Sequence, residues 1–253
     1  MAKLLRLADE FWLSAHDQLG GSCALKDRPF GVGLGTALLC ELVKGRHIVL
    51  ANLSETGFEN WQLFLTDVPW PADDTLYELL FMMCDEVQRL PRHGPLGQSI
   101  SEWIAFLAGD GPDRARALME GVFDDGRYAP ARRVGDRAIE KGRLTRGVPP
   151  VAVPVIRWKM SGRTAVHVPG QATDACWASA GIATALRQRR ALDEQSLLLT
   201  ELYSLTQLDR IVLQTLDPDD VAFLKDQQSS IPADYRTLID HADAVLGNTV
   251  MTG

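Results

Sequence analysis

The side chain types that most often carry catalysis are present, but they form no familiar catalytic pattern. The five histidines are scattered, and no HExxH or HxH pair offers the spacing of metal ligands. No GxSxG segment offers a nucleophilic serine. Adjacent carboxylates do not share a helix face, so such pairs are more typical of helix starts and turns. We therefore expect no enzyme, no metal and no cofactor. The histidines are His16, His47, His93, His167 and His241, and the carboxylate pairs are 9–10, 73–74, 124–125 and 219–220.

A glycine-rich segment, Gly31-Val-Gly-Leu-Gly35, resembles a loop that cradles phosphate. It lacks the lysine of a Walker motif and the full GxGxxG spacing. The residues before it, 25–30, do not form a clear buried strand. We therefore interpret these glycines as small residues at a helix start rather than as a nucleotide site.

Positive charge is concentrated in one segment. Between Arg127 and Arg163 there are ten basic and two acidic side chains, a charge of +8 in a chain whose total is −7. A concentrated basic segment in an acidic protein is typical of a chain with an anionic partner. The candidates are phosphate-bearing lipid, nucleic acid and an acidic protein face. A solvated face balanced by acidic neighbours explains the pattern equally well.

The same segment contains an apolar stretch over residues 147–156. Arg143 and Arg146 precede it, and Arg157, Trp158 and Lys159 follow it. An apolar tip rimmed by cations and a tryptophan is what a peripheral membrane binder needs. A buried strand or hairpin is the alternative. The residues predicted to contact the membrane are Val151, Val153, Val155 and Trp158.

The composition is that of an ordinary globular protein. Apolar residues make up 46% of the 253 positions and charged residues 23%, which excludes a disordered chain, a collagen-like fibre and a coiled-coil rod. The four cysteines include no CxxC pair, so we expect reduced, mostly buried thiols. No signal peptide or membrane-spanning stretch is recognisable, which predicts a cytoplasmic protein, soluble or peripheral. The cysteines are Cys23, Cys40, Cys84 and Cys176.

Helical periodicity dominates the chain, with apolar residues recurring at spacings of three and four. The fold class we expect is mainly α: a single compact domain over residues 1–253, with a helical bundle core, amphipathic helices and small β-hairpins. Starts such as Asp73, Ser99 and Asp193 carry a plausible cap. Helices are predicted at 33–44, 73–90, just after 99, 172–190, 193–205, 217–225 and 233–246, strands at 48–50, 61–65 and 151–159, and loops at 67–71, 91–97 and 109–112.

A Lys-Gly-Arg turn occurs twice, at 44–46 and 141–143, each time between a helix end and an extended segment. Glycine after the last helical residue permits a left-handed cap. We interpret the two as similar helix-to-strand turns. The alternative is a winged-helix-like DNA binder, which the overall acidity and the lack of a recognition helix disfavour.

Five segments, taken in order, resemble the Golgi phosphoprotein 3 family. They are LRLADEFWLSAHD (5–17), GVGLGTALLCELVKGRHIVL (31–50), SEWIAFLAG (101–109), AIEKGRLTR (138–146) and LDEQSLLLTELYSLTQLD (192–209). The set covers nearly the whole chain, and its acidic context resembles the bacterial branch. The resemblance implies a mainly helical domain. For the eukaryotic members it implies a peripheral membrane adaptor that binds phosphatidylinositol 4-phosphate and retains glycosyltransferases by their tails.

The resemblance also implies a headgroup pocket, made by a Trp in an early hairpin, an Arg on the next helix and two later Arg. Counted back from Glu41 and Glu140, these positions are Lys26, Gly35, Tyr128 and Ala131 here. Other cations lie close by in sequence, and the arginine fork can hold phosphate oxygens bidentately. The cluster expected to bind an anionic headgroup is Lys26, Arg28, Arg127, Arg132 and Arg133.

Together these patterns predict a non-enzymatic protein at the inner face of a membrane, with an anionic, phosphoinositide-like phospholipid headgroup as its partner. A cytosolic adaptor that docks an acidic protein through its basic face is the alternative. No nucleic acid partner is expected.

Overall fold

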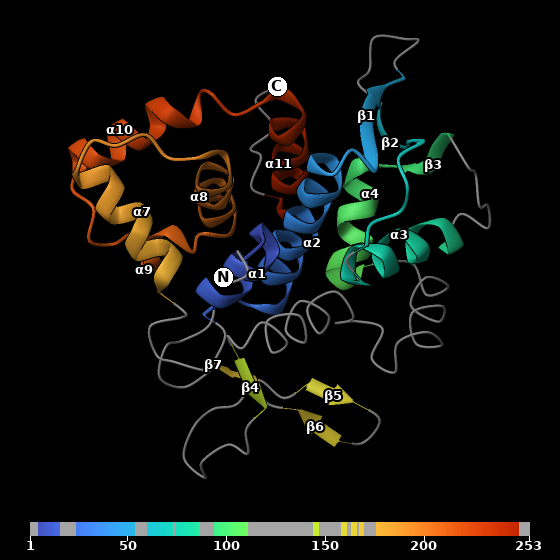
Figure 1. Cartoon of the computed structure of the whole chain (residues 1–253), viewed down its shortest axis with the longest axis horizontal. Helices are drawn as coiled ribbons and strands as arrows, with labels where there is room; N and C mark the ends of the chain where they lie inside the picture. Colours follow the sequence, from blue (N-terminus) through green and yellow to red (C-terminus); the bar gives the residue numbers. More distant parts are fainter. Residues whose placement is uncertain are drawn as a thin grey trace.

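The computed structural model describes residues 5–15, 24–53, 60–72, 74–86, 94–110, 144–146, 158–160, 163–165, 167–169 and 176–247, and these are mainly helical (Figure 1). The mainly α fold class is therefore confirmed. The helices are α1 (Leu7–Ser14), α2 (Asp27–Lys44), α3 (Asp74–Glu86), α4 (Ile100–Ala105) with the π-helical turn η1 (Phe106–Asp110), α7 (Trp177–Arg187), α8 (Glu194–Thr206), α9 (Asp209–Val212), α10 (Pro218–Gln228) and α11 (Ala233–Leu246).

The strands form one three-stranded antiparallel sheet, in the order β1–β2–β3, and two short pairs, β4 with β7 and β5 with β6. In the sheet, Ile48 pairs with Leu65 and Asn52 with Trp61. The strands predicted at 48–50 and 61–65 are therefore confirmed. The bounds are β1 Ile48–Asn52, β2 Trp61–Leu65, β3 Gly94–Ser99, β4 Leu144–Arg146, β5 Trp158–Met160, β6 Arg163–Ala165 and β7 His167–Pro169.

Two predicted loops are wrong in part. Residues 94–97 belong to β3, and residues 109–110 end η1. Gly94 and Pro95 of β3 pair with Leu65 and Phe64 of β2. β3 lies at the edge of the sheet, the kind of strand in which proline is tolerated. Pairing with β2 therefore overrides the local preference of glycine and proline for turns.

α2 lies at the centre of the described fold (Figure 1), where it packs against α1, α8, α11 and η1. All of its residues from 32 to 42 are buried, which is typical of a helix enclosed by its neighbours. The sheet, α3 and α4 lie on one side of it, and α7, α9 and α10 on the other. The two ends of α2 are therefore where its residues reach the surface.

The glycines of the Gly-x-Gly-x-Gly segment lie inside α2, because the helix begins at Asp27 rather than at the predicted residue 33. A Cβ on Gly33 would lie 2.4 Å from the Phe11 ring of α1, and one on Gly31 would lie 2.9 Å from the Ala108 carbonyl oxygen. Such close approach is available only to glycine. These residues therefore let α1 and η1 pack onto α2.

The predicted caps at Ser99 and Asp193 are confirmed. Ser99 Oγ accepts from the N–H of Glu102, whose carboxylate accepts in return from the Ser99 N–H at 2.7 Å. Asp193 accepts from the Ser196 N–H at 2.7 Å. Asp73 lies outside the described residues. The helices α1 and α9 are absent from the sequence prediction.

No helix in the described ranges is both long and apolar enough to cross a bilayer. Of the strand predicted at 151–159, residues 158 and 159 are confirmed as part of β5, and residues 151–157 lie outside the described ranges.

Candidate functional site

Two members of the predicted headgroup cluster, Lys26 and Arg28, lie at the start of α2. Lys26 is the exposed N-cap residue, and its side chain makes no capping hydrogen bond. Arg28 is exposed, and its guanidinium donates to the Val245 carbonyl at 2.8 Å, which ties the start of α2 to the end of α11. The structure thus brings two cations to one end of α2. Arg127, Arg132 and Arg133 lie outside the described residues.

Gly35 occupies the position where the family resemblance implies a headgroup arginine. It is buried in α2, and a Cβ there would lie 3.0 Å from the Leu107 Cβ of η1. A longer side chain would force η1 away from the helix. The packing of η1 onto α2 therefore explains why glycine stands here. Tyr128 and Ala131 lie outside the described residues.

The predicted membrane-contact residues are placed only in part. Trp158 begins β5, and its backbone pairs with Ala165 of β6. Val151, Val153 and Val155 lie outside the described residues.

A pocket of about 420 Å³ lies at the opposite, C-terminal end of α2. At a rise of 1.5 Å per residue, the two ends of this 18-residue helix are about 26 Å apart. The pocket is lined by the start of α1, the last turns of α2, residues 45, 47 and 70–72, and parts of α3 and α8. Its polar lining residues, none of which the sequence analysis assigned to a site, are Arg6, Glu41, Lys44, His47 and Gln195.

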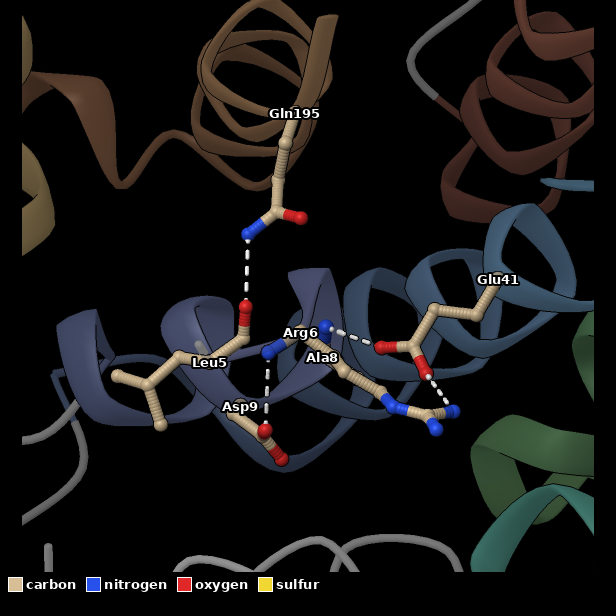
Figure 2. A network of polar contacts seen from close by, with 6 residues as sticks. All are labelled: Leu5, Arg6, Ala8, Asp9, Glu41 and Gln195. Atoms are coloured by element: carbon tan, nitrogen blue, oxygen red, sulfur yellow. Dashed lines mark hydrogen bonds and ion pairs between the residues drawn. The ribbon is translucent and has the colours of Figure 1, made fainter. Parts of the chain in front are cut away.

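Glu41 joins α2 to the start of α1. Its side chain is only 7% exposed. One oxygen accepts from the Ala8 N–H at 2.8 Å, and the other lies 3.7 Å from the Arg6 guanidinium (Figure 2). A carboxylate is favourable at a helix N-terminus, where backbone N–H groups lack partners within the helix. The only sequence signal for it is an acidic residue inside the apolar run of α2.

Gln195 of α8 attaches a third helix to the same region. Its amide donates to the Leu5 carbonyl at 3.1 Å, as Figure 2 shows, and to the Glu10 carboxylate at 2.8 Å. Burial raises the pKa of Glu10, although the Gln195 hydrogen bond acts in the opposite direction. The start of α1 is therefore held from both α2 and α8.

The first Lys-Gly-Arg turn joins the end of α2 to β1, as predicted, but a different residue adopts the left-handed conformation. Gly45 has φ −73°, so it does not use the left-handed conformation, whereas Arg46 has φ 57° and does. A Cβ on Gly45 would lie 2.6 Å from the His47 ring. The absence of a Cβ on Gly45 therefore leaves room for the imidazole in its present position beside the pocket. The second turn, at 141–143, lies outside the described residues.

His47 lines the pocket as a neutral imidazole. Burial lowers its pKa, a hydrogen bond from the ring to the Pro69 backbone acts in the opposite direction, and the positive charge of Arg6 lowers it further. Its Nδ1 atom is buried and has no hydrogen-bond partner among the described residues. This nitrogen is buried behind the pocket surface and is not offered to a ligand.

Three cysteines fall in the described part of the chain, and their placement confirms that these are mostly buried. Cys40 and Cys84 are buried, and Cys176 is half-buried. Burial raises the pKa of Cys40 well above its usual range and that of Cys84 to about 11, so both remain protonated at neutral pH. Cys40 therefore serves as an apolar part of the pocket wall. Cys23 lies outside these residues.

Within the described ranges, no group of three or more His, Cys, Asp and Glu side chains could hold a metal ion. The pocket chemistry is that of a binding site: an apolar wall, two cations at the rim, one buried carboxylate and a neutral imidazole.

Comparison with known proteins agrees with the family resemblance. No curated protein matches the chain. The model of one protein family, described as Golgi phosphoprotein 3 (GPP34), matches residues 7–241. The match begins at α1 and ends within α11, so it includes both ends of α2. This chain belongs to the Golgi phosphoprotein 3 (GPP34) family.

Proposed function

We propose that this chain is a non-enzymatic peripheral membrane protein that binds anionic phospholipid headgroups through a basic patch. The observation that carries the proposal is the pair of exposed cations, Lys26 and Arg28, at the start of α2. The helix N-terminus adds its own positive potential there. Family membership and the charge of +8 over residues 127–163 support the same function.

In this proposal Arg127, Arg132 and Arg133 belong to the same patch as Lys26 and Arg28. Each cation near an anionic membrane surface contributes about 1 kcal/mol, so a handful outweighs the repulsion from the acidic remainder. The apolar residues over 151–155 and Trp158 enter the acyl boundary beside them. The protein then lies on the inner face of a membrane, where anionic lipid is abundant.

Vesicle co-sedimentation tests this function. Vesicles of phosphatidylcholine alone are compared with vesicles that also contain phosphatidylserine, or phosphatidylinositol 4-phosphate at matched charge. We expect pelleting only with the anionic vesicles. A stronger response to phosphatidylinositol 4-phosphate than to phosphatidylserine would assign headgroup selectivity to the patch. No pelleting on any anionic vesicle would refute the proposal.

Charge reversals locate the patch. The double variant Arg132→Glu/Arg133→Glu and the single variant Lys26→Glu should each lower vesicle binding. The matched control is Arg210→Glu/Lys225→Glu, which reverses two exposed cations on α9 and α10. Equal losses in the test and control pairs would mean that only net charge matters, and would remove the site assignment.

A second candidate function, a cytosolic protein–protein adaptor, is favoured by an exposed aromatic cluster. Trp70, Tyr77 and Phe81 are 37%, 46% and 41% exposed, and the rings of Trp70 and Tyr77 lie 5.1 Å apart. Exposed aromatic side chains are typical anchors of protein interfaces. This function predicts a partner captured at a fixed stoichiometry without lipid and lost in Tyr77→Ser/Phe81→Ser. Retention of that partner by the double variant would count against it.

A further inference from the structure

We propose that the pocket at the C-terminal end of α2 binds a small amphipathic carboxylate, whose apolar body fills the pocket and whose carboxylate meets Lys44 and Arg6. The site lies at the other end of α2 from Lys26 and Arg28. It therefore shares no residue with Lys26 and Arg28, the described members of the proposed headgroup patch.

The interior of the pocket suits an apolar body. Leu7, Leu76 and Leu198 line it and are buried among the core residues of α1, α3 and α8, and Pro71 is also buried. The volume of about 420 Å³ falls within the range of small-molecule sites, roughly 300–1,000 Å³. Trp70 forms an exposed part of the wall and is supported from behind by the Tyr77 ring. An apolar ligand would therefore cover surface that water now reaches.

The charges at the rim favour an anion over a cation. The lining contains two cations, Arg6 and Lys44, against one carboxylate, Glu41, which already accepts the Ala8 N–H. Lys44 lies 3.6 Å from Glu194, and the two side chains are 54% and 45% exposed. Such a surface pair is weak, so the ammonium can turn toward a ligand carboxylate at little cost. The net charge of the lining is thus positive while His47 is neutral.

His47 adds no positive charge to the pocket, because burial lowers the pKa of its imidazole. Its Nδ1 atom is buried away from the accessible surface, so a ligand in the pocket does not reach it. The ligand carboxylate is therefore held by the two cations at the rim, Lys44 and Arg6.

Titration of the full chain with sodium octanoate tests the proposal. Octan-1-ol and octylamine hydrochloride have the same apolar body without the negative charge, and sodium acetate has the charge without the body. Calorimetry and tryptophan fluorescence report binding. We expect octanoate to bind more tightly than the other three probes. The proposal is overturned if octanoate does not bind, or if octan-1-ol or octylamine binds equally well.

Substitutions at exposed positions then locate the site. Lys44→Gln should raise the octanoate Kd about fivefold, the effect expected for one exposed ion pair. The matched control, Lys225→Gln at an exposed residue of α10, should leave it unchanged. Ala72→Trp, at an exposed residue of the pocket lining, should fill the mouth and abolish binding. Unchanged octanoate binding in both Lys44→Gln and Ala72→Trp would overturn the assignment.

Trp70→Phe tests whether the change in tryptophan fluorescence comes from octanoate bound in this pocket. The chain has six tryptophans, and Trp70 is the one in the pocket lining. This variant should lose most of the fluorescence response and keep the calorimetric binding. A full fluorescence response in Trp70→Phe would place the ligand elsewhere and refute the site. Failure of the vesicle test would leave these results untouched, because octanoate binding is measured without lipid and its variants, Lys44→Gln and Ala72→Trp, are not vesicle variants.

Discussion

Glu41 is a buried charged side chain of α2, and its two oxygens link α2 to α1. One oxygen accepts a backbone N–H of α1, and the other faces Arg6. Buried polar groups are stable only when paired, and the first turn of α1 supplies N–H groups that lack partners within the helix. Glu41 therefore acts as a cap supplied from a distant part of the chain.

Substitutions of Glu41 should separate its hydrogen bond from its charge. Glu41→Leu leaves the Ala8 N–H without its acceptor and should lower the free energy of unfolding by about 2–3 kcal/mol. Glu41→Gln keeps an amide oxygen as acceptor and should lower it by about 1 kcal/mol. Urea unfolding measures both. Equal losses in the two variants would show that charge, rather than the hydrogen bond, stabilises this contact.

His47 gives the protein a pH dependence of defined sign. Because the folded pKa is below the usual value of about 6.5, the unfolded chain binds this proton more readily. The stability linked to His47 is therefore complete above about pH 6.5 and is lost as the pH falls toward the lowered pKa. Between about pH 7.5 and 5.5, the unfolding free energy of the native protein should fall more than that of His47→Asn. Parallel losses in both proteins would contradict this.

At the scale of elements, α2 is positioned by close contacts that its glycines allow. Gly33 meets the Phe11 ring of α1, and Gly31 and Gly35 meet η1. Because packed interiors leave little free space, α1 and η1 keep these positions only while the glycines remain. The positions of α1 and η1 on α2, the helix that carries the pocket residues and the two cations, thus depend on glycines.

Gly33→Ala and Gly181→Ala should shift stability in opposite directions. In Gly33→Ala the new methyl group clashes with Phe11, and the free energy of unfolding should fall by about 1–3 kcal/mol. Gly181 lies in α7 with open space around it, so Gly181→Ala should gain up to about 1 kcal/mol from helix propensity. Thermal and urea unfolding measure both changes. A stabilised Gly33→Ala would mean that α1 does not pack as described.

The whole molecule is divided in charge. Residues 127–163 carry +8 and the remainder −15, so the acidic part opposes any anionic surface that the basic part attracts. The attraction acts at contact, whereas the repulsion acts over longer distances and is screened by salt beyond roughly 8 Å. Orientation on a membrane is therefore part of the proposed function.

Salt should weaken vesicle binding in a way that depends on the basic residues. Raising the ionic strength from about 0.05 M to about 0.5 M should release the native protein from phosphatidylserine vesicles. The double variant Arg132→Glu/Arg133→Glu should bind weakly at both ionic strengths and change less. Co-sedimentation measures the effect. Binding by the native protein that is insensitive to salt would indicate that apolar insertion, rather than charge, holds it on the vesicle.

The candidate sites were predictable to different degrees. Lys26 and Arg28 could be proposed from charge and the family resemblance, and both lie together at one end of α2. The pocket could not be proposed, because its lining joins Arg6, Glu41, His47 and Gln195 from separate parts of the chain. Each of these residues taken alone is common in a soluble protein.

The sequence by itself determined the mainly helical class, the bounds of β2, the caps at Ser99 and Asp193 and the family. These features depend on neighbours within a few residues, or on an ordered set of local segments. Tertiary structure alone decided that β3 is a strand, that Gly33 and Gly45 provide space, and that a pocket forms at the end of α2. Those features depend on contacts between residues far apart in the chain, whose distances no local pattern encodes.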